Sequence, residues 1–265
     1  MIDIRQSKNY ADYLSSIGWI VERIDGINYF IKKFPLIGSI IKIQRPEKND
    51  YKKINLLAKK YRAFQIILEP KQKLTMNNLQ FKISKSPYLP TKTLQIDLTQ
   101  SKEKIFNQLK KDCKSAIEKN DKLKIKEMKN IEEFKNAWKK SVGLKRYVPP
   151  LSHLTALKKS FKNNSSFLLT ADSSAGAIFL LANDTAYYWQ AFTNKIGRKN
   201  NYQYKIVWEG ILWAKKSGAK VFDFEGIFDE RFPNKSWLGF THFKKSFGGT
   251  EVEYPGCYTK LQLPI

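Results

Sequence analysis

Short apolar runs separated by turn residues dominate the first third of the chain. Three such runs cover residues 19–24, 27–31 and 39–43. Asp25-Gly26 and Pro35 interrupt them, which predicts antiparallel strands joined by tight turns. Apolar residues at helical spacing predict short helices at residues 10–17 and 51–60.

The pattern changes after a segment with two prolines, residues 86–90, where we place a boundary between domains 1–90 and 91–265. Beyond it, one amphipathic helix is expected from Ser101 to Ile117, with lysines on its outer face. The other predicted helices are 130–142, 154–161 and 202–217, with a short helix or turn at 235–247. The predicted strands are 94–98, 123–127, 167–171, 175–182, 186–192, 221–225 and 251–258. An antiparallel meander within this order predicts an α+β fold.

The charge of the chain narrows the choice of partners. Its 265 residues contain 48 Lys and Arg against 24 Asp and Glu, a formal net charge of +24. Such an excess attracts polyanions, such as nucleic acid, anionic lipid or phosphorylated substrates. The alternative is the lysine-rich codon usage of an AT-rich genome, which leaves the low glutamate content unexplained.

Several protein classes are excluded by composition. No apolar run approaches the roughly 18 residues of a membrane-spanning helix, and the polar N-terminus does not read as a signal peptide. Two distant cysteines, Cys113 and Cys257, and two histidines exclude a disulfide framework and a Cys- or His-rich metal site. We therefore expect a cytoplasmic, monomeric protein without a metal.

Four segments together resemble the C-terminal signature of the FemABX family: 186–192, 202–216, 222–227 and 243–249, the last reading Phe-Lys-Lys-Ser-Phe-Gly-Gly. The resemblance implies two GNAT-like domains with mixed central sheets flanked by helices. It also implies transfer of an amino acid from charged tRNA to an amine of the peptidoglycan stem peptide. Aminoacyl-tRNA would be the co-substrate, with no bound cofactor.

The resemblance extends to substrate-binding positions in the first half of the chain. Residues 18–23 resemble the family's Trp-x-x-x-Lys stretch, which places Arg23 on the phosphates of a nucleotide-linked precursor. Residues 43–46 resemble an Arg-Gly-Pro strand end and add Arg45. A second phosphate-binding arginine aligns with Pro149, and Arg146 is the nearest candidate for that role.

Other matching positions concern the donor and the reaction. Tyr188 matches one of two family tyrosines on the central meander strand, and Gln190 replaces the other. By resemblance, Phe243 and Lys244 meet the 3′ end of the charged tRNA and the developing oxyanion. We therefore predict Phe243 as a stacking face for the terminal adenine and Lys244 as the oxyanion stabiliser.

Two carboxylates supply a candidate base. Asp223 and Glu225 alternate with Phe222 and Phe224, so a strand would present both carboxylates on one face. They are predicted to orient the attacking amine or take its proton. The alternative is structural, with both phenylalanines in the core and both carboxylates paired with nearby lysines.

Two other functions remain open. A GNAT-type acyl-CoA transferase needs a glycine-rich pyrophosphate loop, and the matching stretch 193–201 has one glycine, Gly197, although Arg198 and Lys199 could hold an anion. A non-catalytic RNA-binding protein fits the charge, but no RNA-binding motif is present. The acceptor is expected to be a UDP-linked or lipid-linked muramyl peptide. A lipid-linked acceptor would bring the lysine-rich surface against anionic membrane.

Overall fold

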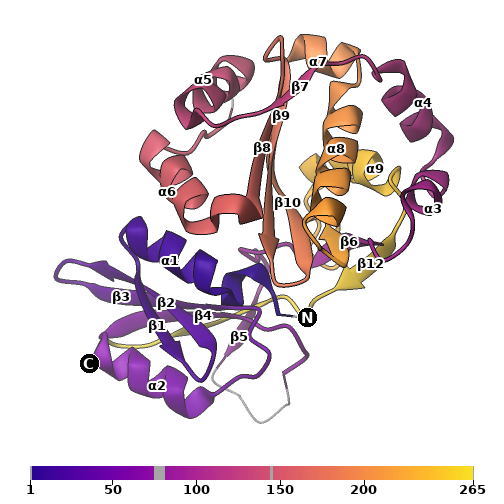
Figure 1. Ribbon diagram of the computed structural model, residues 1–265. Coiled ribbons are helices and arrows are strands. Elements are labelled where there is room, and N and C mark those ends of the chain that lie inside the picture. The colour runs from indigo at the N-terminus through magenta and orange to yellow at the C-terminus, as the bar shows by residue number, and fades with distance from the viewer. Residues whose placement is uncertain (1, 75–80, 144–145, 265) are drawn as a thin grey trace.

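The computed structural model describes residues 2–74, 81–143 and 146–264. Within these residues the chain forms two mixed sheets, each flanked by helices (Figure 1). Strand order is β1-β2-β3-β4-β13-β5 in the first sheet and β12-β6-β11-β10-β9-β8-β7 in the second. No helix among the described residues is both long and apolar enough to span a membrane.

In the first sheet, the three apolar runs form the antiparallel strands that the sequence predicts. A helical crossover follows them. Its leading elements are η1 (Ile4–Gln6), α1 (Lys8–Ser16), β1 (Ile20–Ile24), β2 (Ile27–Phe34), β3 (Gly38–Gln44), α2 (Tyr51–Lys60), β4 (Ala63–Glu69) and β5 (Lys82–Ser84). Asp50 caps α2 by accepting a hydrogen bond from the Lys53 N–H. Because α2 crosses over, β3 and β4 run parallel.

The second sheet contains the predicted meander. Its strands are β6 (Lys92–Asp97), β7 (Ile125–Glu127), β8 (Ser165–Thr170), β9 (Ala175–Ala182), β10 (Thr185–Thr193), β11 (Val221–Asp223) and β12 (Thr250–Glu253). Every residue of β9 is buried, as expected for a strand covered on both faces.

Helices cover both faces of this sheet. They are α3 (Lys102–Asn107), α4 (Lys111–Lys119), α5 (Ile131–Val142), α6 (Leu151–Phe161), η2 (Lys162–Asn164), α7 (Lys195–Lys199), α8 (Tyr202–Lys216), η3 (Lys235–Trp237) and α9 (Leu238–Lys245). In Figure 1, α5 and α6 lie on one side of β8 and β9, and α8 lies on the other. Gly210 lets α8 approach closely, because a Cβ there would collide with the Phe179 ring of β9.

Three sequence predictions are wrong in detail. The helix expected from 101 to 117 is two helices, because Lys110 is extended and its N–H donates to the Ser246 carbonyl. The strand expected at 221–225 ends at Asp223. The strand expected at 251–258 divides into β12 and β13 (Cys257–Leu261), which lie in different sheets.

The chain end therefore crosses the predicted domain division. β13 pairs with β4 and β5 in the first sheet, although residues 91–265 were assigned to the second domain. The core crosses it as well, because Ile4 and Phe30 share one buried cluster with Phe134 and Tyr187. The two sheets are therefore joined by a buried hydrophobic cluster to which residues of the N-terminal segment contribute. The domain boundary near residue 90 stays a prediction.

Candidate active site

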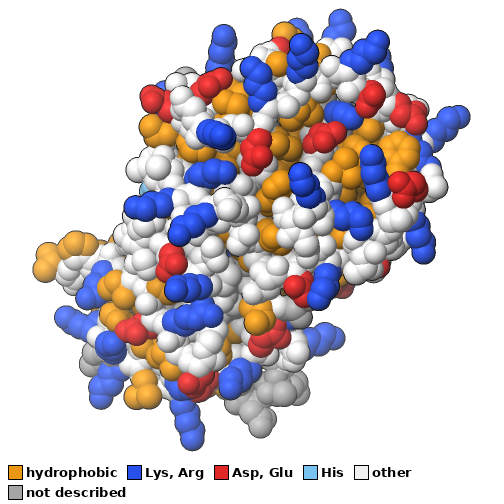
Figure 2. Space-filling model, in the orientation of Figure 1, with side chains coloured by type: hydrophobic (Ala, Val, Ile, Leu, Met, Phe, Trp, Pro, Cys, Tyr) orange, Lys and Arg blue, Asp and Glu red, His pale blue; other side chains and the backbone are white. Residues whose placement is uncertain are grey.

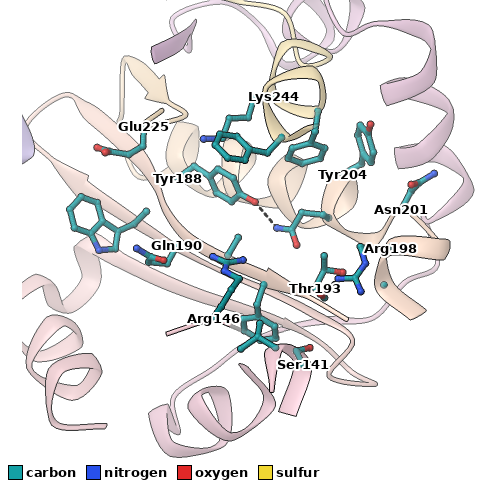
Figure 3. Close-up of a pocket in the computed structure, with 18 of the residues that line it drawn as sticks. Ser141, Arg146, Tyr188, Gln190, Thr193, Arg198, Asn201, Tyr204, Glu225 and Lys244 are labelled. Atoms are coloured by element: carbon teal, nitrogen blue, oxygen red, sulfur yellow. Dashed lines mark hydrogen bonds between the residues drawn. The ribbon is translucent and has the colours of Figure 1, made fainter. Parts of the chain in front are cut away.

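A cleft of about 810 Å³ opens along the second half of β10. It exists because β10 pairs with β11 only through residues 185–187, so the strands separate beyond Tyr187. A register shift between Tyr188 and Gln190 leaves Trp189 as a bulge at the same place. The lining residues include Ser141, Arg146, Tyr188, Trp189, Gln190, Thr193, Arg198, Asn201, Gln203, Tyr204, Glu225, Phe240, Phe243 and Lys244 (Figure 3).

Aromatic side chains form one wall of the cleft. Tyr204 of α8 meets Phe243 of α9 edge to face, with ring centroids 4.8 Å apart. Tyr188 is buried and its hydroxyl accepts a hydrogen bond from Gln203 Nε2 at 2.9 Å. Burial raises the pKa of Tyr188, so its hydroxyl is neutral. Gln203 Oε1 is buried without a partner among the described residues and is an acceptor available to a ligand.

Lys244 reaches the end of the cleft from α9. Its ammonium donates to the Phe224 carbonyl at 2.7 Å and to the Gly226 carbonyl at 2.5 Å. Burial lowers the pKa of Lys244 to about 8, although the charges of Glu225 and Asp223 oppose this shift. Two of the three N–H groups of Lys244 donate to these backbone carbonyls, so the third could donate to an oxyanion.

Glu225 lies between the two carbonyls that Lys244 binds. Its backbone has a φ of 68°, a left-handed conformation that is uncommon for a residue other than glycine. Its carboxylate forms an ion pair with Arg5, with Oε2 2.7 Å from the guanidinium Nη2. Glu225 and Arg198 lie at opposite ends of the cleft (Figure 3).

Asp223 is buried behind Glu225 and does not line the cleft. Its Oδ1 accepts hydrogen bonds from Thr93 Oγ1 at 2.5 Å and from the Glu225 N–H at 2.7 Å. Gln95 Nε2 donates to Oδ2 at 2.8 Å. Burial, and then the charge of Glu225, raise the pKa of Asp223 to about 7 against these hydrogen bonds. Asp223 thus holds the backbone of Glu225.

This geometry corrects the predicted pair of carboxylates on one strand face. The strand ends at Asp223, and Glu225 turns away through its positive φ. Part of the structural alternative holds, since Phe222 and Phe224 are fully buried. The carboxylates, however, bond to Arg5, Thr93 and Gln95 rather than to lysines.

The predicted arginines separate into two groups. Arg146 lines the cleft, whereas Arg23 is an exposed residue of β1 that donates to Asn28 Oδ1 at 3.1 Å. Arg45 is buried, donates to the Pro90 carbonyl and stacks 3.6 Å from the Tyr254 ring centroid. The interior position of Arg45 departs from the predicted substrate contact, because its guanidinium is already occupied by protein groups.

Six of the nine predicted site residues therefore line one cleft: Arg146, Tyr188, Gln190, Glu225, Phe243 and Lys244. No group of three or more potential metal ligands occurs within the described ranges. Cys113 is buried, and burial raises the pKa of its thiol to about 12. It is therefore protonated and unsuited to nucleophilic attack.

The FemAB family model matches residues 103–264, more than half of the chain. The chain belongs to the FemAB family. Membership confirms the resemblance read from the motifs and, with the fold, indicates a transferase. No curated protein sequence matches the chain.

Solved structures share the fold. The crystal structure of FemX has a TM-score of 0.81 at 15% identity, covering 98% of this chain and 92% of that chain. The C-terminal domain of a putative lysylphosphatidylglycerol synthetase from Agrobacterium fabrum has a TM-score of 0.62 at 11% identity, covering 98% and 89%. A GCN5-related N-acetyltransferase from Kribbella flavida has a TM-score of 0.54 at 11% identity, covering 98% and 95%. The predicted fold class of this FemAB-family protein is confirmed.

Motif reasoning missed three polar residues of the site. Arg5 lies far from any motif, and only its ion pair with Glu225 reveals it. Gln203 and Tyr204 stand at the start of the correctly predicted helix 202–217, and no motif assigns them a role. Their position just after the loop 193–201 was the available signal, since helix starts near phosphate-type loops often face ligands.

Proposed function

We propose that this FemAB-family protein moves an aminoacyl group from charged tRNA to an amine of a peptidoglycan stem peptide. The supporting observation is the cleft, which gathers a carboxylate, a buried ammonium and aromatic faces within a family of transferases. A UDP-linked or lipid-linked muramyl peptide is the proposed acceptor. The reaction needs no resident metal or cofactor, because the ester on tRNA is already activated.

The proposed chemistry is direct aminolysis. The ammonium of the acceptor first loses a proton, and its nitrogen lone pair attacks the ester carbonyl carbon. An N–C bond forms, the C–O bond to the ribose breaks, and the ribose oxygen takes up one proton as it leaves. The nitrogen loses a second proton on forming the amide, so one proton is released overall. No covalent enzyme intermediate is required.

Each residue of the cleft has a proposed role in this step. Glu225 accepts a proton from the attacking amine, an effect worth about 10²–10⁴ in rate when the base is well placed. The remaining N–H of Lys244 stabilises the tetrahedral oxyanion, worth about 3–4 kcal/mol. Tyr204 and Phe243 provide faces for the terminal adenine, each stacking contact being worth about 1–3 kcal/mol.

Charged residues at the cleft are proposed to bind phosphate. Arg146 and Arg198 both line it, and a guanidinium matches phosphate with two parallel hydrogen bonds. Arg23 is exposed on the first sheet and stays a proposed contact for the phosphates of a nucleotide-linked acceptor. We also propose a cytoplasmic monomer, whose basic surface (Figure 2) meets anionic membrane when the acceptor is lipid-linked.

The loop expected to hold coenzyme A argues against the acyl-CoA alternative. Residues 195–199 form α7, and the Gly197 N–H donates to Asn194 Oδ1 at 3.0 Å. A pyrophosphate loop needs such N–H groups free to meet phosphate. The Gly197 donor is instead satisfied by the chain itself.

The test is a transfer assay with two donors. Purified protein is incubated with bulk charged tRNA, and separately with acetyl-CoA, each with a UDP-linked muramyl pentapeptide and with its lipid-linked form. The mass of the acceptor is then measured. A gain of one amino-acid residue with tRNA alone is expected. A gain with acetyl-CoA alone, or no gain with any pair, contradicts the proposal.

A further inference from the structure

We propose that Arg5, from the N-terminal segment, is a positioning residue that holds the Glu225 carboxylate at the end of the cleft. The inference rests on the proposed function, because it assigns Arg5 a place in the same transfer reaction. It makes η1 part of the active site although it precedes the first sheet in the chain.

The contacts of the guanidinium fix the side chain of Glu225 from outside the cleft. Arg5 Nη2 lies 2.7 Å from Glu225 Oε2, and Nη1 lies 3.2 Å from Asp3 Oδ1. The guanidinium carbon is 5.3 Å from the ring centroid of Trp189, the bulged residue of β10. Arg5 thereby joins the carboxylate to the bulge, and both line the cleft.

The backbone around Arg5 is anchored to both sheets. The Ile4 N–H donates to the hydroxyl of Tyr187 on β10 at 3.1 Å. On the first sheet, Asn28 Nδ2 donates to the Arg5 carbonyl at 2.9 Å. Gln6 Nε2 donates to the Gln44 carbonyl at 2.6 Å. With the segment held at both ends of η1, the guanidinium has little freedom to move.

Stability alone does not explain a buried arginine at this place. Arg5 is 5% exposed, and its Nε has no partner among the described residues. A cavity of about 10 Å³ lies beside it, room for about one water. Apolar residues in place of buried ion pairs are often neutral or stabilising. The need to keep the Glu225 carboxylate oriented in the cleft accounts for a buried guanidinium at this place.

The role predicts a loss in kcat rather than in substrate binding. Arg5 does not line the cleft itself, so it does not touch substrate there. Without it, the Glu225 side chain is free to leave its position, and misplacement by about 1 Å costs about 10²-fold in rate. The KM values for both substrates should stay near those of the wild type.

The experiment compares Arg5→Met, Glu225→Gln and the double variant in the tRNA transfer assay. Arg5→Met should lower kcat about 10²-fold, with unchanged KM for charged tRNA and muramyl pentapeptide. The double variant should be no slower than Glu225→Gln, because Arg5 acts through that carboxylate. Arg231→Met is the control variant. It also removes an arginine 2.7 Å from a carboxylate, that of Asp229, but outside the cleft, and should keep the wild-type kcat.

Folding of each variant is checked by circular dichroism. Should Arg5→Met fail to fold, Arg5→Lys replaces it, since lysine keeps the charge but not the planar fork, and a kcat between those of wild type and Glu225→Gln is expected. Wild-type kcat in the folded variant, or losses that multiply in the double variant, overturn the inference while the proposed function stands. A wild-type protein that transfers nothing refutes the proposed function, and this inference with it.

Discussion

Replacing Lys244 with methionine should remove one identifiable part of the pH dependence of stability. In the folded protein, burial lowers the pKa of Lys244 to about 8 from the ordinary 10.5. Between these values the unfolded chain binds more protons than the folded one. The contribution of this residue to the free energy of unfolding therefore rises with pH across that window.

The magnitude follows from the two pKa values. At pH 7 the shift disfavours the folded state by about 3 kcal/mol, and at pH 10 by about 1 kcal/mol. The difference is about 2 kcal/mol, a size that is common for single mutations and measurable. Methionine keeps the apolar stem but cannot titrate, and it leaves the carbonyls of Phe224 and Gly226 without their donor.

The assay is urea unfolding of wild type and Lys244→Met at pH 7 and pH 10. The variant should lose more stability relative to wild type at pH 10 than at pH 7, by about 2 kcal/mol. Titration of the groups that do not interact with Lys244 cancels in this comparison. Lys111→Met, which changes an exposed lysine of α4, should give the same difference from wild type at both pH values. An equal effect of Lys244→Met at both pH values would refute the reasoning.

Three further changes probe the site and its support. Glu225→Gln should lower kcat for transfer about 10²–10⁴-fold, since the amide cannot take a proton, and an unchanged rate would remove Glu225 from the mechanism. Gly210→Ala gains about 1 kcal/mol of helix propensity but forces a Cβ against Phe179, at about 1–3 kcal/mol; thermal unfolding should show a net loss. Asp223→Asn removes a carboxyl whose pKa is raised to about 7. As the pH rises from 4 to 7, the free energy of unfolding of the wild type should therefore fall relative to that of the variant in urea titrations. Parallel pH dependences of the two proteins would contradict this.

Local patterns predicted the meander well because they agree with its tertiary setting. Residues 167–171, 175–182 and 186–192 were expected as strands, and β8, β9 and β10 cover them within a few residues. The turns between them contain polar residues, β8 and β9 are buried throughout, and the first half of β10 is buried as well. Here the local sequence and the packed sheet favour the same conformation.

The errors arise where a distant contact overrides the local pattern. The helix predicted through residue 110 breaks because the Lys110 N–H bonds to Ser246, over 130 positions away in the chain. The last predicted strand divides at Pro255-Gly256, where Gly256 has a φ of 106° and proline cannot donate to a ladder. That dipeptide was a readable signal. The ion pair of Arg5 with Glu225 was not, since nothing local links residues 220 positions apart.

Energetic costs concentrate around Glu225, and their pattern supports the proposed functional role of this residue. Its own backbone is left-handed, at about 1–3 kcal/mol for such strain. Lys244 is held charged against a lowered pKa, and Asp223 has a raised pKa. A structural network would place opposite charges so that each pKa shift favours the charged form. Here burial disfavours the charged form of both Lys244 and Asp223. Both side chains nevertheless bond to the backbone at Glu225 or beside it, and the carboxylate of Glu225 lines the cleft. An apolar strand end would avoid these costs, so the arrangement supports the role proposed for Glu225 in the cleft.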